Sequence, residues 1–473
     1  MKILFATSEA QPFAASGGLG DVAGSLPKAI RAKGIACRVV MPLYSDISSE
    51  WKDKMTYICN FTVPVGWRKQ YCGLFEYNHG GVIFYFLDNE YYFKRSGLYG
   101  FYDEAERFAF FSRAALEMLW HIDYVPDIIH CNDWQTALIP VYLDIFYRCQ
   151  SKFFNIKSIY TIHNIEYQGK YGFEIMEDVL GIPSNFKSLM QYDDCINMTK
   201  AAIEVANKVT TVSKSYSSEI LDPCYSHGLD RELVHHTYKL CGILNGIDYD
   251  VNNPMTDEGI YKNYSASDVS GKQNNRTGLC HDLKLSDDNQ PVVGIVSRMV
   301  RHKGFDLIKY ALENLIKSGF KFAVLGSGEY IYESFFDYMH KQYPDRISIY
   351  IGYNKNMAKK IYAGSDMFLM PSQSEPCGLA QMIALRYGSV PIVRETGGLK
   401  DTITDCSLGS GNGFTFSSYN ADDMANALHR ARKIYEDKPV WESLLKHCMS
   451  CDFSWNKSAS KYVFLYQEVL GLK

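Results

Sequence analysis

The sequence predicts an α/β protein with two doubly wound parallel sheets, and three observations carry that prediction. Short apolar runs rich in β-branched and aromatic residues recur along the chain, and each is followed by helical periodicity. Such runs, separated by helices, are typical of parallel sheets covered on both faces. The runs form two series, which indicates two domains. A chain of 473 residues with 47% hydrophobic and 22% charged residues has an ordinary globular composition.

The predicted strands follow one another at intervals that leave room for a helix between most of them. The first series comprises residues 3–6, 37–40, 82–87, 127–130, 158–162 and 209–212. The second comprises residues 292–296, 322–325, 347–351, 367–370 and 391–393. The seam lies near 246–254 and is followed by a polar stretch at 261–273. We predict a last helix over 456–472, beyond the final strand of the second series.

Composition excludes several classes of function. With 49 Lys and Arg against 53 Asp and Glu, the net charge of −4 disfavours general binding to nucleic acid or anionic membranes. The apolar start ends at Ala6 and Glu9 follows soon after, which favours a strand over a signal peptide. Thirteen scattered cysteines do not suit a disulfide framework, and we interpret the pair Cys448 and Cys451 as structural. We therefore expect a reducing, cytoplasmic compartment.

Two similar glycine turns lie at residues 16–21 and 396–401. Each comes after a predicted strand, and the residues that follow have the pattern of a helix. Glycines at such a turn let backbone N–H groups approach an anion at the helix N-terminus, although close packing alone also explains them. The G-x-G-x-x-G spacing of dinucleotide-binding proteins is absent, because Gly18 and Gly20 are followed by Gly24. This spacing argues against a dehydrogenase.

Polar residues gather just beyond the predicted strands, where ligands of open α/β sheets bind. They are Asp133, His163, Asn245, Arg298, Lys303, Gly326–Gly328, Tyr353, Glu375 and Thr396–Gly398. Arg298 and Lys303 suit a diphosphate, although a solvated basic turn explains them too. We considered a metal at Asp248-x-Asp250, but the pair lies at the seam, and we expect no metal site.

Glu375 precedes Pro376, which suits the first turn of a helix that we predict to run to Tyr387 and to end at Gly388. A carboxylate there can hold sugar hydroxyls or a developing positive charge, or it can simply stabilise the helix. Aromatic residues at 91–93 and 99 are interleaved with charged ones. Their faces suit sugar rings, and a core hairpin is an equally good explanation.

Seven motifs, in this order and spacing, resemble those of bacterial glycogen synthases and plant starch synthases, which are retaining glycosyltransferases of the GT-B fold. The resemblance runs essentially from end to end. Its two most specific motifs are SRMVRHKGFDLI at 297–308 and PSQSEPCGLAQMIALRYGSVPIVRETGGLKDT at 371–402. The others are PFAASGGLGDVAGSLPKAI at 12–30, NEYYFKRSGLYG at 89–100, HCNDWQTALIP at 130–140, YTIHNIEYQG at 160–169 and LNGIDYDVNNP at 244–254.

The resemblance implies two Rossmann-like domains facing each other across a cleft. It implies an acceptor-side domain over 1–241, a hinge over 242–254, a nucleotide-sugar-binding domain over 255–455 and a C-terminal helix over 456–473 that returns to the first domain. The implied reaction transfers glucose from ADP-glucose, with retention, to the non-reducing 4-OH of an α-1,4-glucan. The implied partners are ADP-glucose or UDP-glucose and a glycogen or maltooligosaccharide primer. No cofactor, metal, nucleic acid or membrane is implied.

The resemblance also implies roles for individual residues. The implied catalytic residues are Glu375, His163, Asp133, Arg298 and Lys303. The implied donor-binding residues are Gly18, Asn164, Asn245, Arg298, Lys303, Tyr353, Glu375, Cys377, Gly378, Thr396, Gly397 and Gly398. The implied acceptor-binding residues are Tyr91, Tyr92 and Trp134.

The chain departs from the family where the first glycine loop normally opens with lysine, because it has Ala15 there. Loss of one charge-assisted contact costs about 1.5–3 kcal/mol, or roughly 10- to 150-fold in rate, if nothing compensates. Cys131 and Asn132 are smaller departures. Two alternatives therefore stay open: a weakened homologue that mainly binds glucan, and a GT-B transferase with another donor such as UDP-glucose.

Overall fold

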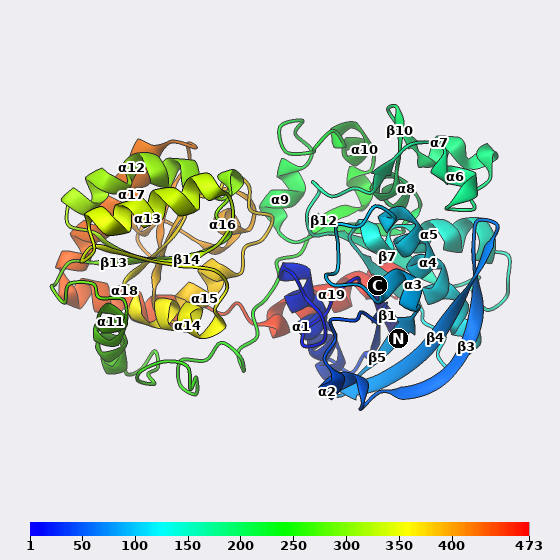
Figure 1. The fold of residues 1–473 in the computed structure, drawn as a ribbon, viewed down its shortest axis with the longest axis horizontal. Coiled ribbons are helices and arrows are strands. Elements are labelled where there is room, and N and C mark those ends of the chain that lie inside the picture. Colours follow the sequence, from blue (N-terminus) through cyan, green and yellow to red (C-terminus); the bar gives the residue numbers. More distant parts are fainter. Residues whose placement is uncertain (473) are drawn as a thin grey trace. The chain divides into compact units, whose positions relative to one another are not determined.

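The computed structural model describes residues 1–472 and divides the chain into two compact units (Figure 1). The first unit contains residues 1–246 together with the C-terminal segment that begins at Trp455. The second unit contains Ile247–Ser454. Lys473, the last residue of the predicted segment 456–473, lies outside the described residues. Among the helices of residues 1–472, none is long and apolar enough to cross a membrane.

The first unit contains one large sheet and one small one. The strands of the large sheet are β1 Lys2–Ala6, β2 Ala36–Pro42, β3 Thr56–Val65, β4 Arg68–His79, β5 Val82–Asp88, β6 Ile128–Asn132, β7 Lys157–Ile162, β11 Lys208–Thr211 and β12 Leu240–Gly242. Their order is β12-β11-β7-β6-β1-β2-β5-β4-β3. From β12 to β5 every neighbouring pair is parallel, and β4 and β3 extend the sheet antiparallel. The small sheet joins β8 Lys170–Tyr171, β10 Cys195–Asn197 and β9 Gln191–Tyr192.

Helices lie between most of the strands of the first unit along the chain. They are α1 Gly18–Ala32, α2 Ser49–Lys52, α3 Glu90–Phe93, α4 Glu104–Glu117, α5 Leu138–Tyr142, α6 Ile175–Asp178, α7 Lys187–Met190, α8 Met198–Val205, α9 Lys214–Glu219, α10 Asp230–His235 and α19 Trp455–Val469. In α1 the buried residues Leu19, Val22, Leu26 and Ile30 recur at helical spacing, so one face meets the core.

Helix α19 packs beside α1 on the first unit (Figure 1). Its Tyr466 hydroxyl lies 2.8 Å from Nδ1 of His130, which is buried in β6. Near its C-terminal end, Glu468 pairs with Lys208 at 2.6 Å. A buried hydrogen bond between side chains 336 residues apart in sequence therefore ties the end of the chain to the middle of the large sheet.

The second unit is a six-stranded parallel sheet. Its strands are β13 Val292–Val296, β14 Lys321–Gly326, β15 Ile347–Ile351, β16 Met367–Met370, β17 Val390–Arg394 and β18 Phe414–Phe416. Their order is β15-β14-β13-β16-β17-β18. The helices are α11 Ser270–Asp282, α12 Phe305–Lys317, α13 Tyr330–Gln342, α14 Lys355–Gly364, α15 Ala380–Arg386, α16 Gly397–Thr402, α17 Ala421–Glu436 and α18 Lys438–Ser450. Figure 1 shows α12, α13 and α17 on one face and α11, α14, α15 and α18 on the other.

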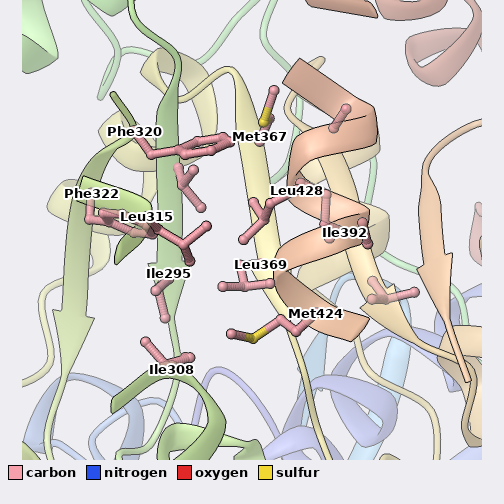
Figure 2. Close-up of a cluster of buried hydrophobic side chains, with 14 of the residues drawn as sticks. Ile295, Ile308, Leu315, Phe320, Phe322, Met367, Leu369, Ile392, Met424 and Leu428 are labelled. Atoms are coloured by element: carbon pink, nitrogen blue, oxygen red, sulfur yellow. The ribbon is translucent and has the colours of Figure 1, made fainter. Parts of the chain in front are cut away.

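Figure 2 shows how the sheet and two helices of the second unit form its main core. Ile295 and Leu369 extend from neighbouring strands toward α12 and α17. Met424 and Leu428, four residues apart on α17, meet them from the helix side. Alternation along the strands and a spacing of four along the helix therefore place these side chains on the buried face.

The predicted α/β class with parallel sheets is confirmed, and each predicted strand is present within a few residues of its expected bounds. Sequence reasoning missed the antiparallel pair β3 and β4, because these strands alternate exposed and buried residues instead of forming continuous apolar runs. It also missed the short strands β12 and β18. Pro64 in β3 fits the edge position of that strand, where no further partner needs its missing N–H.

Each unit has one point at which the direction of strand addition reverses. In the first unit the chain adds strands outward from β1 through β2 and then starts again at β6 on the other side. In the second unit the corresponding reversal lies between β13 and β16. Open α/β sheets bind ligands beyond the carboxyl ends of the strands at such a point. The fold therefore specifies where in each unit a site is expected.

Candidate active site

Asp133 follows β6 at the reversal point of the first unit. Its φ of 57° is rare for a residue with a side chain, and such strain concentrates at functional sites. The carboxyl accepts a hydrogen bond from the backbone N–H of His163 at 2.7 Å. Burial raises the pKa of Asp133 to about 7, although backbone N–H groups of His163 and Asn164 oppose the shift. The group can therefore change charge near neutral pH.

His163 follows β7, the strand beside β6. Nε2 of its half-buried ring lies 2.9 Å from Oδ1 of Asn132, the last residue of β6. Burial lowers the pKa of His163 to about 3, so the ring is neutral at pH 7. A neutral imidazole has one donor and one acceptor nitrogen, which makes it a hydrogen-bonding group for a polar ligand. Sequence reasoning did not single out Asn132 as a functional residue.

The first glycine loop already binds a carboxylate of the chain itself. Glu9 is buried, and its Oε2 accepts hydrogen bonds from the backbone N–H of Ser16 and from the Ser16 hydroxyl, the latter at 2.8 Å. Burial raises the pKa of Glu9. Gly18 is exposed and starts α1 as predicted. The backbone N–H of Ser16 is therefore already used within the chain, and the role of Gly18 stays a prediction.

Ala15 and Glu9 are neighbours in this loop. A Cβ added at Gly20 would lie 2.3 Å from Cβ of Ala15 and 3.8 Å from Cδ of Glu9. Position 15 is half-buried and brings no charge beside the carboxyl. Glu9 lies three residues beyond β1, and this position after a strand was the one signal in the sequence that pointed to it.

Two asparagines complete the polar group of the first unit. The side-chain oxygen of Asn164 accepts a hydrogen bond from the backbone N–H of Glu166 at 3.0 Å. The backbone N–H of Asn164 donates to the carboxyl of Asp133. Asn245 follows β12 and is buried, and its Oδ1 has no hydrogen-bond partner within residues 1–472. Since a buried polar atom without a partner costs free energy, Asn245 is a candidate to bind a ligand.

The three predicted acceptor residues differ in exposure. Tyr91 is 60% exposed on α3. Tyr92 is fully buried and its hydroxyl donates to Glu106, and Trp134 is buried with its ring edge-on to Phe108. Adjacent residues of the short helix α3 point about 100° apart, and of the three rings only that of Tyr91 is exposed. The rings of Tyr92 and Trp134 pack in the core, and the acceptor-binding roles of all three residues stay predictions.

A lysine and a carboxylate meet at the reversal point of the second unit. Lys303, beyond β13, places Nζ 2.7 Å from Oε2 of Glu375, beyond β16. The Ser372 hydroxyl donates to the same oxygen at 3.0 Å. The side chains of Lys303 and Glu375 are 18% and 9% exposed, so the pair is largely shielded from water. Arg298 is exposed and makes no ion pair with any residue in the described part of the chain.

The predicted helix that starts at Pro376 is wrong in its first turn. The helix α15 begins at Ala380, because Gly378 adopts a φ of +70° that a helix does not allow. The Gln381 side chain donates to the carbonyls of Cys377 and Gly378, which fixes the loop in front of the helix. The helix ends at Arg386, and Gly388 with φ +62° follows as predicted.

The second glycine loop packs directly on the Glu375 loop. Gly398 N donates to the carbonyl of Glu375 at 3.1 Å. A Cβ at Gly397 would lie 2.0 Å from that same oxygen, and one at Gly398 would lie 2.0 Å from the Cys377 carbonyl. Only glycine fits this approach, and the buried Thr396 precedes the α16 helix there. The loop therefore holds Glu375 in place as well as opening a helix N-terminus.

Tyr353 lies beyond β15 and is 87% exposed. Gly352 N donates to the carbonyl of Gly326 at 2.9 Å, which joins the ends of β15 and β14. The turn after β14 is joined in the same way to the loop after β13, because Met299 N donates to Ser327 O at 2.9 Å. Tyr353 thus presents an open aromatic face at the carboxyl edge that also carries Arg298 and Lys303.

Two further motifs have structural explanations. Oδ1 of Asp248 accepts from the backbone N–H of Asp250 at 2.8 Å, which makes Asp248-x-Asp250 a turn. Cys448 lies in α18 and donates to the carbonyl of Asn412 at 3.2 Å, and Cys451 caps the helix end. Within residues 1–472 no three His, Cys, Asp or Glu side chains are placed to hold a metal ion.

These groups define the chemistry that the units can perform. The second unit offers a carboxylate for sugar hydroxyls, cations for phosphate and an aromatic face for a base. The first offers the neutral His163, the Asp133 carboxyl with a pKa of about 7, and the Asn245 amide oxygen, which has no partner within residues 1–472. Two doubly wound units with such sites define a glycosyltransferase of the GT-B fold. The fold comparison agrees, since sucrose-phosphate synthase from Thermosynechococcus elongatus matches over all of both chains with a TM-score of 0.62 at 17% identity.

The chain belongs to the glycogen synthase family. Residues 2–235 match the starch synthase catalytic domain, and residues 281–442 match glycosyl transferases group 1. The glycogen synthase of Clostridium acetobutylicum is 49% identical over 99% of this chain and 100% of its own, and that of Caldicellulosiruptor saccharolyticus is 48% identical with the same coverage. The catalytic domain of Arabidopsis thaliana starch synthase IV, bound to ADP and acarbose, superposes with a TM-score of 0.92 at 34% identity over 99% of both chains.

Proposed function

We propose that this enzyme transfers glucose from ADP-glucose, with retention, to the non-reducing 4-OH of an α-1,4-glucan. The observation that carries the proposal is the ion pair of Lys303 and Glu375 at the reversal point of the second unit. A ligand that engages both groups needs a hydrogen-bond donor for the carboxylate close to a negative charge for the ammonium, because the two charged atoms are 2.7 Å apart. A sugar joined to a diphosphate has that chemistry.

The donor half of the proposal assigns roles within the second unit. Arg298 and Lys303 bind the diphosphate, and the loop of Thr396, Gly397 and Gly398 at the start of α16 lies against it. Glycosyl transfer passes through an oxocarbenium-like transition state while negative charge grows on the leaving diphosphate. Cations fixed in advance stabilise that charge and supply the largest catalytic term. No cofactor or metal enters the proposal.

The donor sugar and the base take the remaining groups. Glu375 binds sugar hydroxyls beside the growing positive charge, and Cys377 and Gly378 form the loop against which the sugar lies. Tyr353 stacks on the base with its exposed face. Since every base has such a face, the choice of ADP-glucose over UDP-glucose rests on the starch synthase IV relative, which is bound to ADP.

Groups of the first unit contact the sugars. Asp133, His163, Asn164 and Asn245 line the reaction centre, and Gly18 lies against the phosphates. The unpartnered Oδ1 of Asn245 and the neutral ring of His163 support this assignment. Tyr91 binds the acceptor with its exposed face, and the buried Tyr92 and Trp134 act behind it by shaping the surface.

The test is incorporation of labelled glucose into glycogen or a maltooligosaccharide, with ADP-glucose and UDP-glucose supplied separately. We expect α-1,4-linked product with ADP-glucose, and Glu375→Ala serves as the inactive reference. Label only from UDP-glucose would overturn the donor and leave the reaction class intact. Glucan binding without label from either donor would instead establish a weakened homologue that mainly binds glucan.

One observation favours that second candidate. Ala15 provides no cation beside Glu9, so the first glycine loop carries a buried carboxyl where the proposed donor brings phosphate. The cytoplasm is the proposed compartment, and it is supported by the cysteines between Cys37 and Cys451, which form no disulfide within the described chain.

A further inference from the structure

Asn132 is a buried residue whose side chain is held from three directions. It is the last residue of β6, with β1 on one side and β7 on the other. Its Nδ2 donates to the carbonyl of Ala6 on β1 at 3.0 Å and to that of His130 at 3.3 Å. Its Oδ1 lies 2.9 Å from Nε2 of His163. The Asn132 amide therefore links the carboxyl ends of β1 and β6 to the ring of His163, which follows β7.

The two carbonyls determine which way the amide points. A carbonyl oxygen accepts hydrogen bonds and cannot donate, so the atom of Asn132 that faces Ala6 and His130 must be the NH₂ group. A flipped amide would set three oxygen atoms against one another in a buried place, where polar groups without a hydrogen-bond partner are strongly unfavourable. Oδ1 is therefore the atom that faces His163.

The orientation of the amide in turn determines the tautomer of His163. Oδ1 only accepts, so Nε2 of His163 must carry the proton. Burial lowers the pKa of His163 to about 3, so the ring is neutral and Nδ1 keeps a lone pair. Nδ1 makes no hydrogen bond to any residue of the described chain, although the backbone N–H of His163 is held by Asp133 at 2.7 Å.

We propose that Asn132 is a positioning residue for glucosyl transfer, which fixes His163 in the Nε2–H tautomer so that Nδ1 accepts a hydrogen bond from one hydroxyl of the donor sugar. The inference rests on the proposed function. It assigns Asn132 a role that acts through His163. It also specifies the polarity of the contact, since the ligand group that faces Nδ1 must donate.

The test is a coupling experiment with a panel of ADP-glucose analogues, each lacking one sugar hydroxyl. In the parent enzyme we expect one analogue, the one that lacks the hydroxyl bound by Nδ1, to have an extra loss in kcat/KM. Its kcat/KM should be roughly 3- to 13-fold lower than those of the other analogues, which is the effect of one neutral hydrogen bond. In Asn132→Leu, which keeps the volume and removes the amide, that extra loss disappears.

Thr211→Val is the matched control. It removes a buried hydrogen bond of 2.8 Å from β11 to the carbonyl of Ile162, the residue before His163, and leaves Asn132 and the ring in place. We expect this variant to lose stability and to keep the extra loss for the same analogue. An Asn132→Leu variant that is impaired equally toward every analogue would reduce Asn132 to a structural residue and overturn the inference.

A second measurement uses the parent protein with Asn132 unchanged and does not require catalytic activity. Nitrogen-15 NMR of histidine-labelled full-length protein reports which ring nitrogen is protonated, and the signals of His163 are those missing from His163→Gln. A proton on Nδ1 would refute the inference directly. If the parent transfers no glucose from any nucleotide sugar, the proposed function fails; if it does and the coupling is absent, only the role of Asn132 fails.

Discussion

Replacing Glu375 by glutamine separates its charge from its shape. The variant keeps the volume and an oxygen that can accept from Ser372, but it removes the charge that faces Lys303 at 2.7 Å and the donor sugar. A charge-assisted hydrogen bond contributes about 1.5–3 kcal/mol, so we expect kcat/KM to fall roughly 10- to 150-fold. Stability falls as well, because Lys303 is largely buried and loses its counter-charge, at a cost of up to about 3–5 kcal/mol.

The assay is initial-rate transfer from ADP-glucose to maltooligosaccharide, corrected for the folded fraction measured by urea unfolding. Asp366→Asn is the control, because Asp366 pairs with Arg276 at 3.2 Å in the same unit and is equally shielded, with both side chains under 10% exposed. Asp366→Asn should lower stability and leave kcat/KM of the folded enzyme unchanged. The reasoning is refuted if the two variants lose the same activity, or if Glu375→Gln keeps the parent rate.

Three other predictions address charge and stability. Ala15→Lys places a cation beside Glu9 and should raise kcat/KM by about tenfold or more, whereas an unchanged rate would show that another group already supplies that charge. Tyr466→Phe removes the hydrogen bond to His130 and should lower the free energy of unfolding by about 1–3 kcal/mol in urea; an unaltered midpoint would show that α19 does not depend on that bond. Burial lowers the pKa of Lys272 from its ordinary value of 10.5 to about 7. Between pH 7 and pH 10.5 the unfolded chain therefore binds more protons than the folded protein, so the free energy of unfolding rises with pH. Comparison of the parent with Lys272→Met should show this rise as a difference of about 1.4 kcal/mol per pH unit from pH 7.5 to 9.5, and parallel curves would contradict the low pKa.

Much of the site could be predicted from the sequence because each residue lies just past an apolar run. Lys303 and Glu375 were singled out in this way, and so were Asp133 and His163. The order of the strands in the sheet was not predictable from the runs. That order brings β13 beside β16 and so joins Lys303 to Glu375 across 72 residues.

Side-chain direction was the other feature beyond the sequence. Tyr91 and Tyr92 are adjacent and chemically identical, and the packing of α3 alone decides that one is exposed and the other buried. Glu9 gave no motif of its own, since its role arises from the fold of the loop that brings Ser16 back to it. The helix expected at Pro376 starts later because Gly378 takes a positive φ that no sequence rule required.

The sequence by itself determined the α/β class, the two strand series and the residues at the strand ends, because apolar periodicity and glycine turns are local properties of the chain. Only the tertiary structure decided which of these residues meet. Asn132 ends β6 and His163 follows β7, and their 2.9 Å contact exists because β6 and β7 pair in parallel with their carboxyl ends level. Hydrogen bonds between strands and the burial that accompanies them depend on the whole sheet, so the tautomer of His163 and the charge of Asp133 are properties of the fold.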